Sequence, residues 1–344
     1  MFENSEKTNL SELGEFGLIQ HLTKDYSPSR SSTVIGIGDD AAVIDTGAGN
    51  VLVLSNDTLV EGVHFDMVYT PLKHLGYKSV VVNLSDVVAM NARPSQIVLS
   101  MAISSKYTLE AIEAFYEGVY AACKQYNVDL VGGDTTSSLS GLVISISAIG
   151  EARKEEIIYR NGASESELIC VSGDLGGAYA GLQVLEREKS VYIDNPKMQP
   201  DLEGFDYILQ RQLKPEARLD VIDQLKELEV KPTAMIDISD GLSSELFHVA
   251  SSSSCGITIY EDKLPIDQLT YDTMRYMNID PTTAMLNGGE DYELLFSIRQ
   301  EDYEKIKHLP TVTTIGHVTA KGMTLISKDG KSHELEAQGW KHLK

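Results

Sequence analysis

The chain has 344 residues, of which 42% are hydrophobic and 23% charged, and its formal net charge is −22. This length favours two domains over a single hydrophobic core, and the negative charge argues against a nucleic-acid or anionic-membrane partner. No stretch is long and apolar enough to span a bilayer, and the N-terminus MFENSEKTNL lacks the features of a signal peptide, so a cytoplasmic location is expected.

The first part of the sequence mixes strand and helix patterns. An apolar stripe predicts a helix over 10–23. A long helix is expected from Pro71, which suits a first helical turn, to about Met90. Thr108 is suited to cap a further helix over 108–126. The strands expected in this part are 33–37, 41–45, 51–55, 97–104, 128–133 and 142–150.

A polar stretch over 150–167 is the best candidate for a domain boundary, with a short strand expected at 157–160 inside it. The second part begins with a strand, a turn and a helix from 168 onwards. Two helices flank Pro215, and another is expected from about Asp240. Its remaining strands are expected at 234–237, 257–260, 291–298, 312–317 and 322–327.

Short acidic segments interrupt the chain, most of them where a strand-like apolar run meets Gly, Ser, Thr or Asn. Carboxylates at the ends of buried elements are costly to bring together without a counter-charge. Oxygen ligands with small flanking residues favour Mg²⁺ together with phosphate oxygens, so the sequence predicts a metal-rich phosphate site. The segments are GIGDDAAV (36–43), LSNDTL (54–59), NLSDVV (83–88), GGDTT (132–136), IDISDGLSSEL (236–246) and NGGEDYELLF (287–296).

Each segment also has a simpler interpretation as a Gly/Asp turn or a helix cap, and it is their number that favours metal binding. GIGDDA formally matches the dinucleotide fingerprint, but Asp39 and Asp40 would repel a pyrophosphate at a helix N-terminus. No Walker A or protein-kinase signature is present, so ATP would have to rely on metals and backbone amides.

The chain resembles the thiamine-monophosphate kinase family of the aminoimidazole-ribonucleotide-synthetase-like superfamily, from 14–20 to 339–343. The resemblance implies an α/β (α+β) fold with two domains. Residues 1–150 would form an N-terminal sheet domain that binds ATP and Mg²⁺ and pairs in a homodimer, and residues 151–344 an α/β domain that completes the nucleotide and substrate site. It rests on the combination of GIGDDAAV, SNDTLVEGVHF, KSVVVNLSDVVAMNARP, GGDTT, ISDGLSSEL and GGEDYELLF.

The implied reaction is direct, in-line, Mg²⁺-dependent transfer from ATP to thiamine phosphate, which gives thiamine diphosphate and ADP. No general base is expected, because a phosphate monoester has a second pKa of about 6. By position, the resemblance implies the metal ligands Asp40, Ser55, Asn56, Asp57, Asp86, Asp134, Asp237 and Asp240, with Asn56 where the family usually has Thr. It implies nucleotide contacts at Tyr116, Gly133, Asp134, Arg160 and Ser239, and a thiamine-phosphate pocket with His64, Glu290 and Trp340.

Two other classes of function stay open. The first is another chemistry of the superfamily, in which ATP activates an amide, carbamoyl or selenide substrate. The selenide version is weakened because no cysteine precedes Cys123. The second is a non-catalytic protein whose acidic loops bind Ca²⁺, which fares poorly because no segment forms an EF-hand loop.

Overall fold

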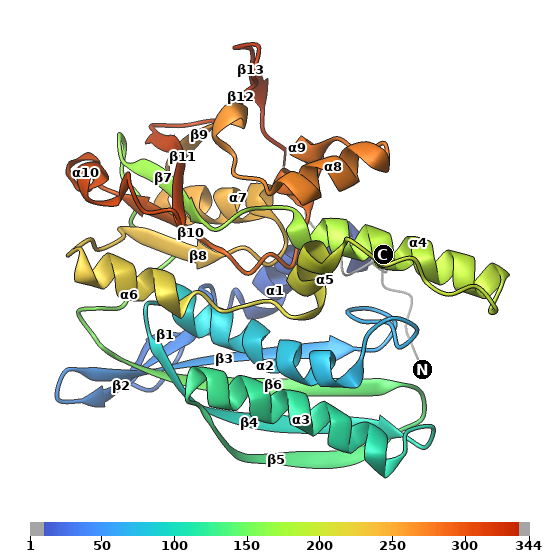
Figure 1. The fold of residues 1–344 in the computed structure, drawn as a ribbon. Helices are drawn as coiled ribbons and strands as arrows, with labels where there is room; N and C mark the ends of the chain where they lie inside the picture. The colour runs from blue at the N-terminus through green and yellow to red at the C-terminus, as the bar shows by residue number, and fades with distance from the viewer. Residues whose placement is uncertain (1–9, 337–344) are drawn as a thin grey trace, which may run out of the picture.

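The computed structural model describes residues 10–336, which form two β-sheets, one from each part of the chain, with helices around and between them (Figure 1). The expected α/β architecture is therefore confirmed. Helix α1 (Leu10–Thr23) precedes the first sheet, as expected from its apolar stripe. Within residues 10–336, the structure has no helix with the length and apolarity needed to cross a membrane.

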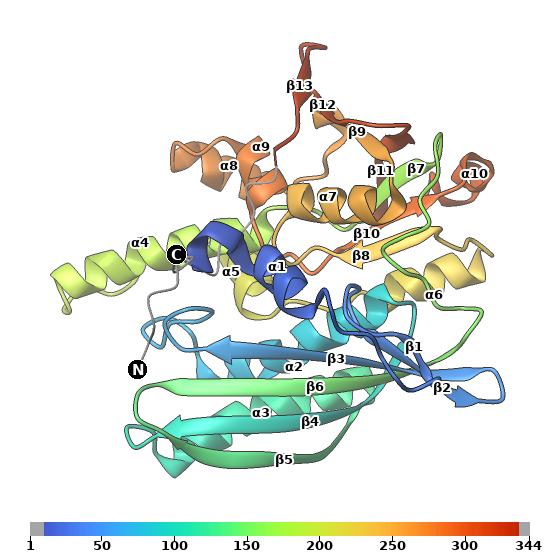
Figure 2. The same ribbon diagram turned by 180° about the vertical axis from the view of Figure 1, so that it is seen from behind.

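The first sheet is mostly antiparallel, in the order β1-β2-β3-β6-β4-β5, and β4 and β5 pair in parallel. Helices α2 (Leu72–Ala89) and α3 (Leu109–Tyr126) cover one face, whereas no helix lies in front of β3, β6, β4 and β5 in the opposite view (Figure 2). The strands are β1 (Thr33–Ile35), β2 (Ala42–Gly47), β3 (Asn50–Val60), β4 (Arg93–Ser104), β5 (Asp129–Ser138) and β6 (Leu142–Arg153).

The second sheet has the order β13-β12-β9-β11-β7-β10-β8, in which only β12 and β9 are parallel neighbours. Its strands are β7 (Leu168–Ser172), β8 (Ala234–Asp237), β9 (Gly256–Tyr260), β10 (Leu294–Ile298), β11 (Val312–Thr319), β12 (Met323–Ile326) and β13 (Ser332–Glu334). The helices of this half are α4 (Gly177–Asp194), α5 (Asp206–Leu213), α6 (Leu219–Glu227), α7 (Leu242–Ser253), α8 (Gln268–Tyr276), α9 (Pro281–Asn287) and α10 (Tyr303–Ile306).

Helix α2 connects the two halves, because it covers the first sheet and also contacts β8 and α5 (Figure 1). Being covered on several sides, it buries Lys78, Asn83 and Ser85 as well as its apolar residues. Gly76 lets α3 approach closely, since a Cβ there would lie 1.9 Å from the Phe115 carbonyl oxygen. The polar side chains of α2 are therefore held at fixed positions between the two sheets.

Several expectations need correction. The strand expected at 157–160 is absent, because Ile157 and Ile158 are buried in the core and the Ile158 N–H bonds instead to the Met90 carbonyl at 3.3 Å. GGDTT lies inside β5 and is not a turn. The strand expected at 291–298 begins only at Leu294, because Glu290 and Tyr292 adopt left-handed backbone conformations. Helices α8, α9 and α10 and strand β13 were not predicted from the sequence.

Candidate active site

Three of the predicted acids meet where the two halves of the chain join. Asp40 precedes β2, Asp86 lies near the end of α2, and Asp237 is the last residue of β8. One carboxylate oxygen from each lies within 4.8 Å of the others. Asp57 on β3 is close enough for its charge to act on Asp86 and Asp237. These residues, Asp40, Asp57, Asp86 and Asp237, are called the carboxylate cluster below.

The end of α2 is tied to β3 and β8 by hydrogen bonds. Asn83 Oδ1 accepts from the Asp57 N–H at 2.8 Å, and the Asn83 carbonyl accepts from Ser55 Oγ at 3.3 Å. Ser85 Oγ donates to Asp237 Oδ2 at 2.5 Å. Because side chains alternate along a strand, Ser55 and Asp57 both face α2. Hydrogen bonds among α2, β3 and β8 thus hold the carboxylates of the cluster in position.

The electrostatics of the cluster show excess negative charge. Burial, followed by the charges of Asp57 and Asp237, raises the pKa of Asp86 well above its ordinary value. Burial and the charge of Asp40 raise the pKa of Asp237 to about 8. Oδ2 of Asp40 is buried without a hydrogen-bond partner in the described part of the chain. Oxygen-only donors with an unused lone pair and surplus charge fit Mg²⁺.

Arg160 lies next to the cluster, in the segment that links the two halves. Its Nε donates to Asp40 Oδ1 at 3.0 Å, and its backbone N–H lies 3.3 Å from the Asp39 carboxylate. Burial and the charge of Asp40 raise the pKa of Asp39 to about 6. The guanidinium predicted to contact phosphate therefore pairs with a predicted metal ligand in this structure.

Ser239 and Asp240 follow Asp237 in the turn before α7. The Ser239 carbonyl accepts from the Glu290 N–H at 2.7 Å, so the two acidic turns of this half are adjacent. The Asp240 N–H donates to Glu245 Oε1 at 3.1 Å. Burial and the charge of Asp240 raise the pKa of Glu245 well above its ordinary value. The structure thus brings a further buried acid to this side of the cluster.

Glu290 and His64 belong to the predicted acceptor pocket. Glu290 Oε1 pairs with Lys78 Nζ at 2.7 Å, and its Oε2 accepts from Gln212 Nε2 at 2.7 Å. His64 Nδ1 accepts from the Val60 N–H at 3.0 Å, which places the proton of the neutral ring on Nε2. Trp340, the third predicted pocket residue, lies outside the described residues.

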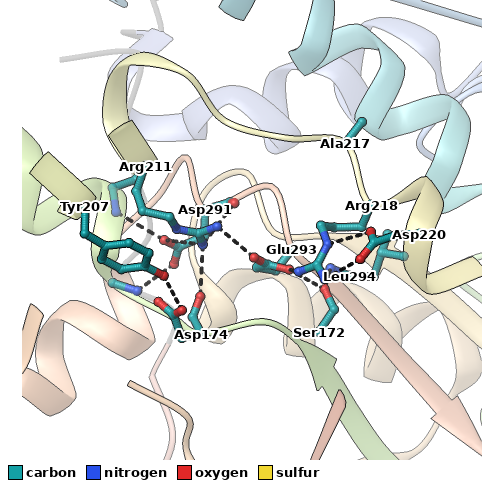
Figure 3. Close-up of polar contacts among 12 residues, drawn as sticks. Ser172, Asp174, Tyr207, Arg211, Ala217, Arg218, Asp220, Asp291, Glu293 and Leu294 are labelled. Atoms are coloured by element: carbon teal, nitrogen blue, oxygen red, sulfur yellow. Dashed lines mark hydrogen bonds and ion pairs between the residues drawn. The ribbon is translucent and has the colours of Figure 1, made fainter. Parts of the chain in front are cut away.

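A set of paired charges flanks Glu290 and is called the arginine network below (Figure 3). Arg211 Nη1 donates to Glu293 Oε1 at 2.8 Å, and Arg218 pairs with the other oxygen of the same carboxylate. Asp291 accepts from the Gly176 N–H at 2.8 Å and lies 3.5 Å from Arg211. The network consists of Asp174, Arg211, Arg218, Asp220, Asp291 and Glu293.

Four predicted residues are not brought to the cluster within one protomer. Asn56 points to the opposite face of β3, where its Nδ2 donates to Ser147 Oγ at 2.9 Å. Two strands separate β3 from β5, so Asp57 and Gly133, which lie in one row of the sheet, are about 14 Å apart at ~4.8 Å per strand. Asp134 and Tyr116 are the other two, on β5 and α3.

Several residues of the site were not predicted from the sequence. Asp39 and Glu245 stood inside recognised acidic segments, so the doubled acid of GDD and the SDGLSSEL segment were usable signals. Gln212 lies outside the quoted segments, and Lys78 begins the segment KSVVVNLSDVVAMNARP without having been assigned a role. Both side chains contact Glu290, which is far from them in the sequence. Tyr292 was also not predicted. Burial is the largest cause that raises the pKa of its hydroxyl, and the charges of Glu290 and of the cluster raise the pKa further.

Comparison with known proteins identifies the family of the chain. Residues 38–152 match the family AIR synthase related protein, N-terminal domain, and residues 164–328 match its C-terminal domain. Thiamine-monophosphate kinase from Bacillus subtilis (strain 168) is 36% identical over 340 residues, which is 96% of this chain and all of that protein. The chain belongs to the thiamine-monophosphate kinase family. The enzyme of that name from Aquifex aeolicus (strain VF5) is 35% identical, covering 97% of this chain and 99% of its own.

A solved structure in the thiamine-monophosphate kinase family supports the same assignment. It is described as "AaThiL complexed with AMPPCP and TMP" and superposes with a TM-score of 0.82 at 32% identity. The superposition covers 98% of this chain and 100% of that one. The aminoimidazole-ribonucleotide-synthetase-like fold implied by the sequence is thereby confirmed.

Proposed function

We propose that this protein transfers the γ-phosphoryl group of ATP to thiamine phosphate and so forms thiamine diphosphate and ADP. The observation that carries the proposal is the buried carboxylate cluster at the junction of the two halves, in a chain of the thiamine-monophosphate kinase family. Similarity to a structure holding an ATP analogue and TMP supports ATP as co-substrate and thiamine phosphate as acceptor.

Mg²⁺ is the proposed cofactor, as several ions. The proposed ligands share oxygen donors: Asp40, Ser55, Asn56, Asp57, Asp86, Asp134, Asp237 and Asp240. The Asn56 side chain is turned away from the cluster, so its contribution would come from the backbone carbonyl. When bound, the metal supplies positive charge that offsets the repulsion between two phosphate-bearing substrates.

The protein's own residues bind and orient the substrates. Arg160 is proposed as a phosphate ligand because its guanidinium lies beside the cluster, where it now pairs with Asp40. Ser239 is the second nucleotide contact proposed in this region, with Tyr116, Gly133 and Asp134 as the others. Glu290, His64 and Trp340 are proposed to hold the thiamine moiety.

No residue is needed as a general base, because the acceptor phosphate is largely deprotonated at neutral pH with a second pKa of about 6. Direct in-line transfer follows, without a phosphorylated protein intermediate. Incubation with ATP labelled in the γ-phosphate is expected to leave the protein unlabelled during turnover. Covalent label that appears and is then transferred to the acceptor would refute the direct mechanism.

We further propose a homodimer that pairs the uncovered faces of the first sheet. Leu54 and Val131 remain 39% and 57% exposed on this sheet. Asp134 pairs in register with Ser100, whose side chain points away from α2 and α3. Light scattering after size-exclusion chromatography is expected to give twice the 37.8 kDa chain mass; a monomer would contradict the dimer.

A coupled assay for ADP tests the proposed function itself. With Mg²⁺ and ATP, thiamine phosphate is expected to support ADP formation, whereas free thiamine is not, because it lacks the attacking phosphate. Thiamine diphosphate should appear in equal amount to ADP. Absence of ADP formation with thiamine phosphate would refute the proposal. It would favour the alternative function, in which ATP activates an amide, carbamoyl or selenide substrate. A cytoplasmic location stays a prediction.

A further inference from the structure

We propose that Lys78 is a positioning residue for the acceptor site, which holds the Glu290 carboxylate from the opposite half of the molecule. The inference rests on the proposed function, because Glu290 matters here as a contact of the thiamine moiety. Within residues 10–336, the polar contacts of the Lys78 ammonium are with Glu290 and the Gln212 carbonyl, neither of which belongs to the carboxylate cluster or to the nucleotide contacts named above. It acts through Glu290.

The contacts of Lys78 are few and specific. Its Nζ lies 2.7 Å from Glu290 Oε1 and donates to the Gln212 carbonyl at 3.0 Å. The Lys78 side chain is only 6% exposed, whereas Glu290 keeps 27% of its surface open. A buried ammonium is costly unless it is paired, so Lys78 depends on Glu290 for its charge balance. Glu290, in turn, has one oxygen fixed by Lys78 and the other by Gln212, yet still faces solvent.

The backbone that carries Glu290 is fixed separately. Glu290 and Tyr292 have φ values of 67° and 51°, left-handed conformations that cost about 1 kcal/mol or more each for such residues. Asp291 and Glu293, which alternate with them, are anchored by Arg211 and other members of the arginine network (Figure 3). Contacts within the C-terminal half thus hold the backbone of this segment in place, and Lys78 holds the Glu290 side chain.

Helix α2 relates the acceptor carboxylate to the carboxylate cluster. Lys78 and Ser85 are seven residues apart, which places them on one face of the helix and about 10 Å apart along its axis. Ser85 holds Asp237 of the cluster by a hydrogen bond of 2.5 Å. The same face of α2 therefore holds Glu290 at a fixed distance from the cluster. Such a separation suits an acceptor whose ring binds at Glu290 and whose phosphate lies at the cluster.

The test is a double-mutant cycle between Lys78→Met and Glu290→Gln, with steady-state constants for thiamine phosphate and for ATP. Lys73→Met on the same helix is the matched control, since Lys73 forms an ion pair with Glu117 in which both side chains are at least 60% exposed. Calorimetric titration of thiamine phosphate into protein with Mg²⁺ and a non-hydrolysable ATP analogue measures binding without turnover. Thermal melting reports the folded state of every variant.

Lys78→Met is expected to raise the KM and the dissociation constant for thiamine phosphate roughly 10- to 100-fold, the loss typical of a misplaced charged hydrogen-bond partner. The KM for ATP should change less than about twofold, and Lys73→Met should match the wild type. The double variant should bind thiamine phosphate as Glu290→Gln does, because a residue that acts through Glu290 adds nothing once that carboxylate is gone.

Two results would overturn the role of Lys78 while leaving the proposed function intact. One is wild-type affinity for thiamine phosphate in a folded Lys78→Met protein. The other is a double variant at least tenfold weaker than Glu290→Gln, which would show that Lys78 acts independently. If Lys78→Met does not fold, the double variant, which removes both charges of the pair, gives the second comparison on its own. A wild-type protein inactive with thiamine phosphate would instead refute the proposed function.

Discussion

The carboxylate cluster and the arginine network both bury several acids, yet they balance charge in different ways. In the arginine network, Glu293 is paired with two guanidinium groups, Arg211 and Arg218 (Figure 3). In the carboxylate cluster, Arg160 pairs with Asp40, while burial and the charges of Asp57 and Asp237 raise the pKa of Asp86. Carboxylates and guanidinium groups of the network thus offset one another's charge within the protein, whereas we propose that cations offset the charge of the cluster. This difference distinguishes a proposed structural group of charges from a proposed metal site.

Replacing Asp86 is the change expected to have the largest effect on activity. Asp86→Asn should lower turnover about 10³-fold or more, because metal-assisted charge stabilisation is worth several kcal/mol. In the presence of a chelator the same variant should unfold at a higher urea concentration than the wild type, because one of the repelling charges is gone. The coupled ADP assay and urea unfolding measure the two effects. Turnover within tenfold of the wild type would remove Asp86 from the metal site.

The arginine network should respond in the opposite sense to the loss of one acid. Glu293→Gln leaves two buried guanidinium groups short of a counter-charge and should lower the free energy of unfolding by about 3 kcal/mol. Glu301→Gln is the control, since its ion pair with Arg299 is 75% and 67% exposed and should contribute less than about 1 kcal/mol. Urea unfolding in a chelator measures both variants. If the two cost the same, the network is not the structural anchor described here.

Stability should also depend on pH in a way that identifies the cluster. Its acids have raised pKa values, about 8 for Asp237, so the folded protein keeps protons that the unfolded chain releases above pH ~4. Stability without metal should therefore fall as pH rises from about 4 to 8, by about 1.4 kcal/mol per pH unit for each acid still to ionise.

The variant Asp237→Asn assigns this pH dependence to the cluster. Burial also raises the pKa of Asp291 in the arginine network to about 7, so the wild-type slope contains both regions. In Asp237→Asn, the part of the pH dependence of stability that comes from the cluster should be lost. Saturating Mg²⁺ should weaken the pH dependence in the wild type only. Melting curves from pH 5 to 8, recorded in a chelator and again with Mg²⁺, measure the pH dependence. An unchanged slope in Asp237→Asn would contradict the raised pKa.

The smallest effect is expected at Asn56, which belongs to neither region. On the face of β3 that points away from the cluster, its side chain donates to Ser147 Oγ and to the Ile146 carbonyl of β6. Asn56→Thr should therefore leave the KM for ATP within about twofold of the wild type. Stability should change by less than about 1 kcal/mol, because a short polar side chain is kept. A KM raised tenfold would show instead that the Asn56 side chain turns round and binds metal.

The sequence predicted those parts of the structure whose causes are local. The helix capped by Thr108 formed as expected because the cap and the apolar period lie in the same stretch, and Ala111 N–H does bond to Thr108 Oγ1. Three acids of the cluster, Asp40, Asp86 and Asp237, were predicted and do meet. Their roles as ligands stay predictions.

What the sequence did not predict depends on contacts between distant residues. Lys78 begins a quoted segment but was given no role, because only folding brings it to Glu290. The Asp134 segment looked like a turn because of its glycines, but pairing with β4 makes it a strand on the far edge of the sheet. Ile157 and Ile158 do not form the expected strand, because their side chains are buried in the core. Pairing partners of this kind are set by the whole fold, beyond the reach of local patterns.

The most direct test of the cluster as a cation site is anomalous diffraction from crystals grown with Mn²⁺ in place of Mg²⁺, a non-hydrolysable ATP analogue and thiamine phosphate. Peaks are expected between the carboxylates of Asp40, Asp86 and Asp237, with none inside the arginine network. Crystals with both ligands bound and no peak at these three carboxylates would contradict the account.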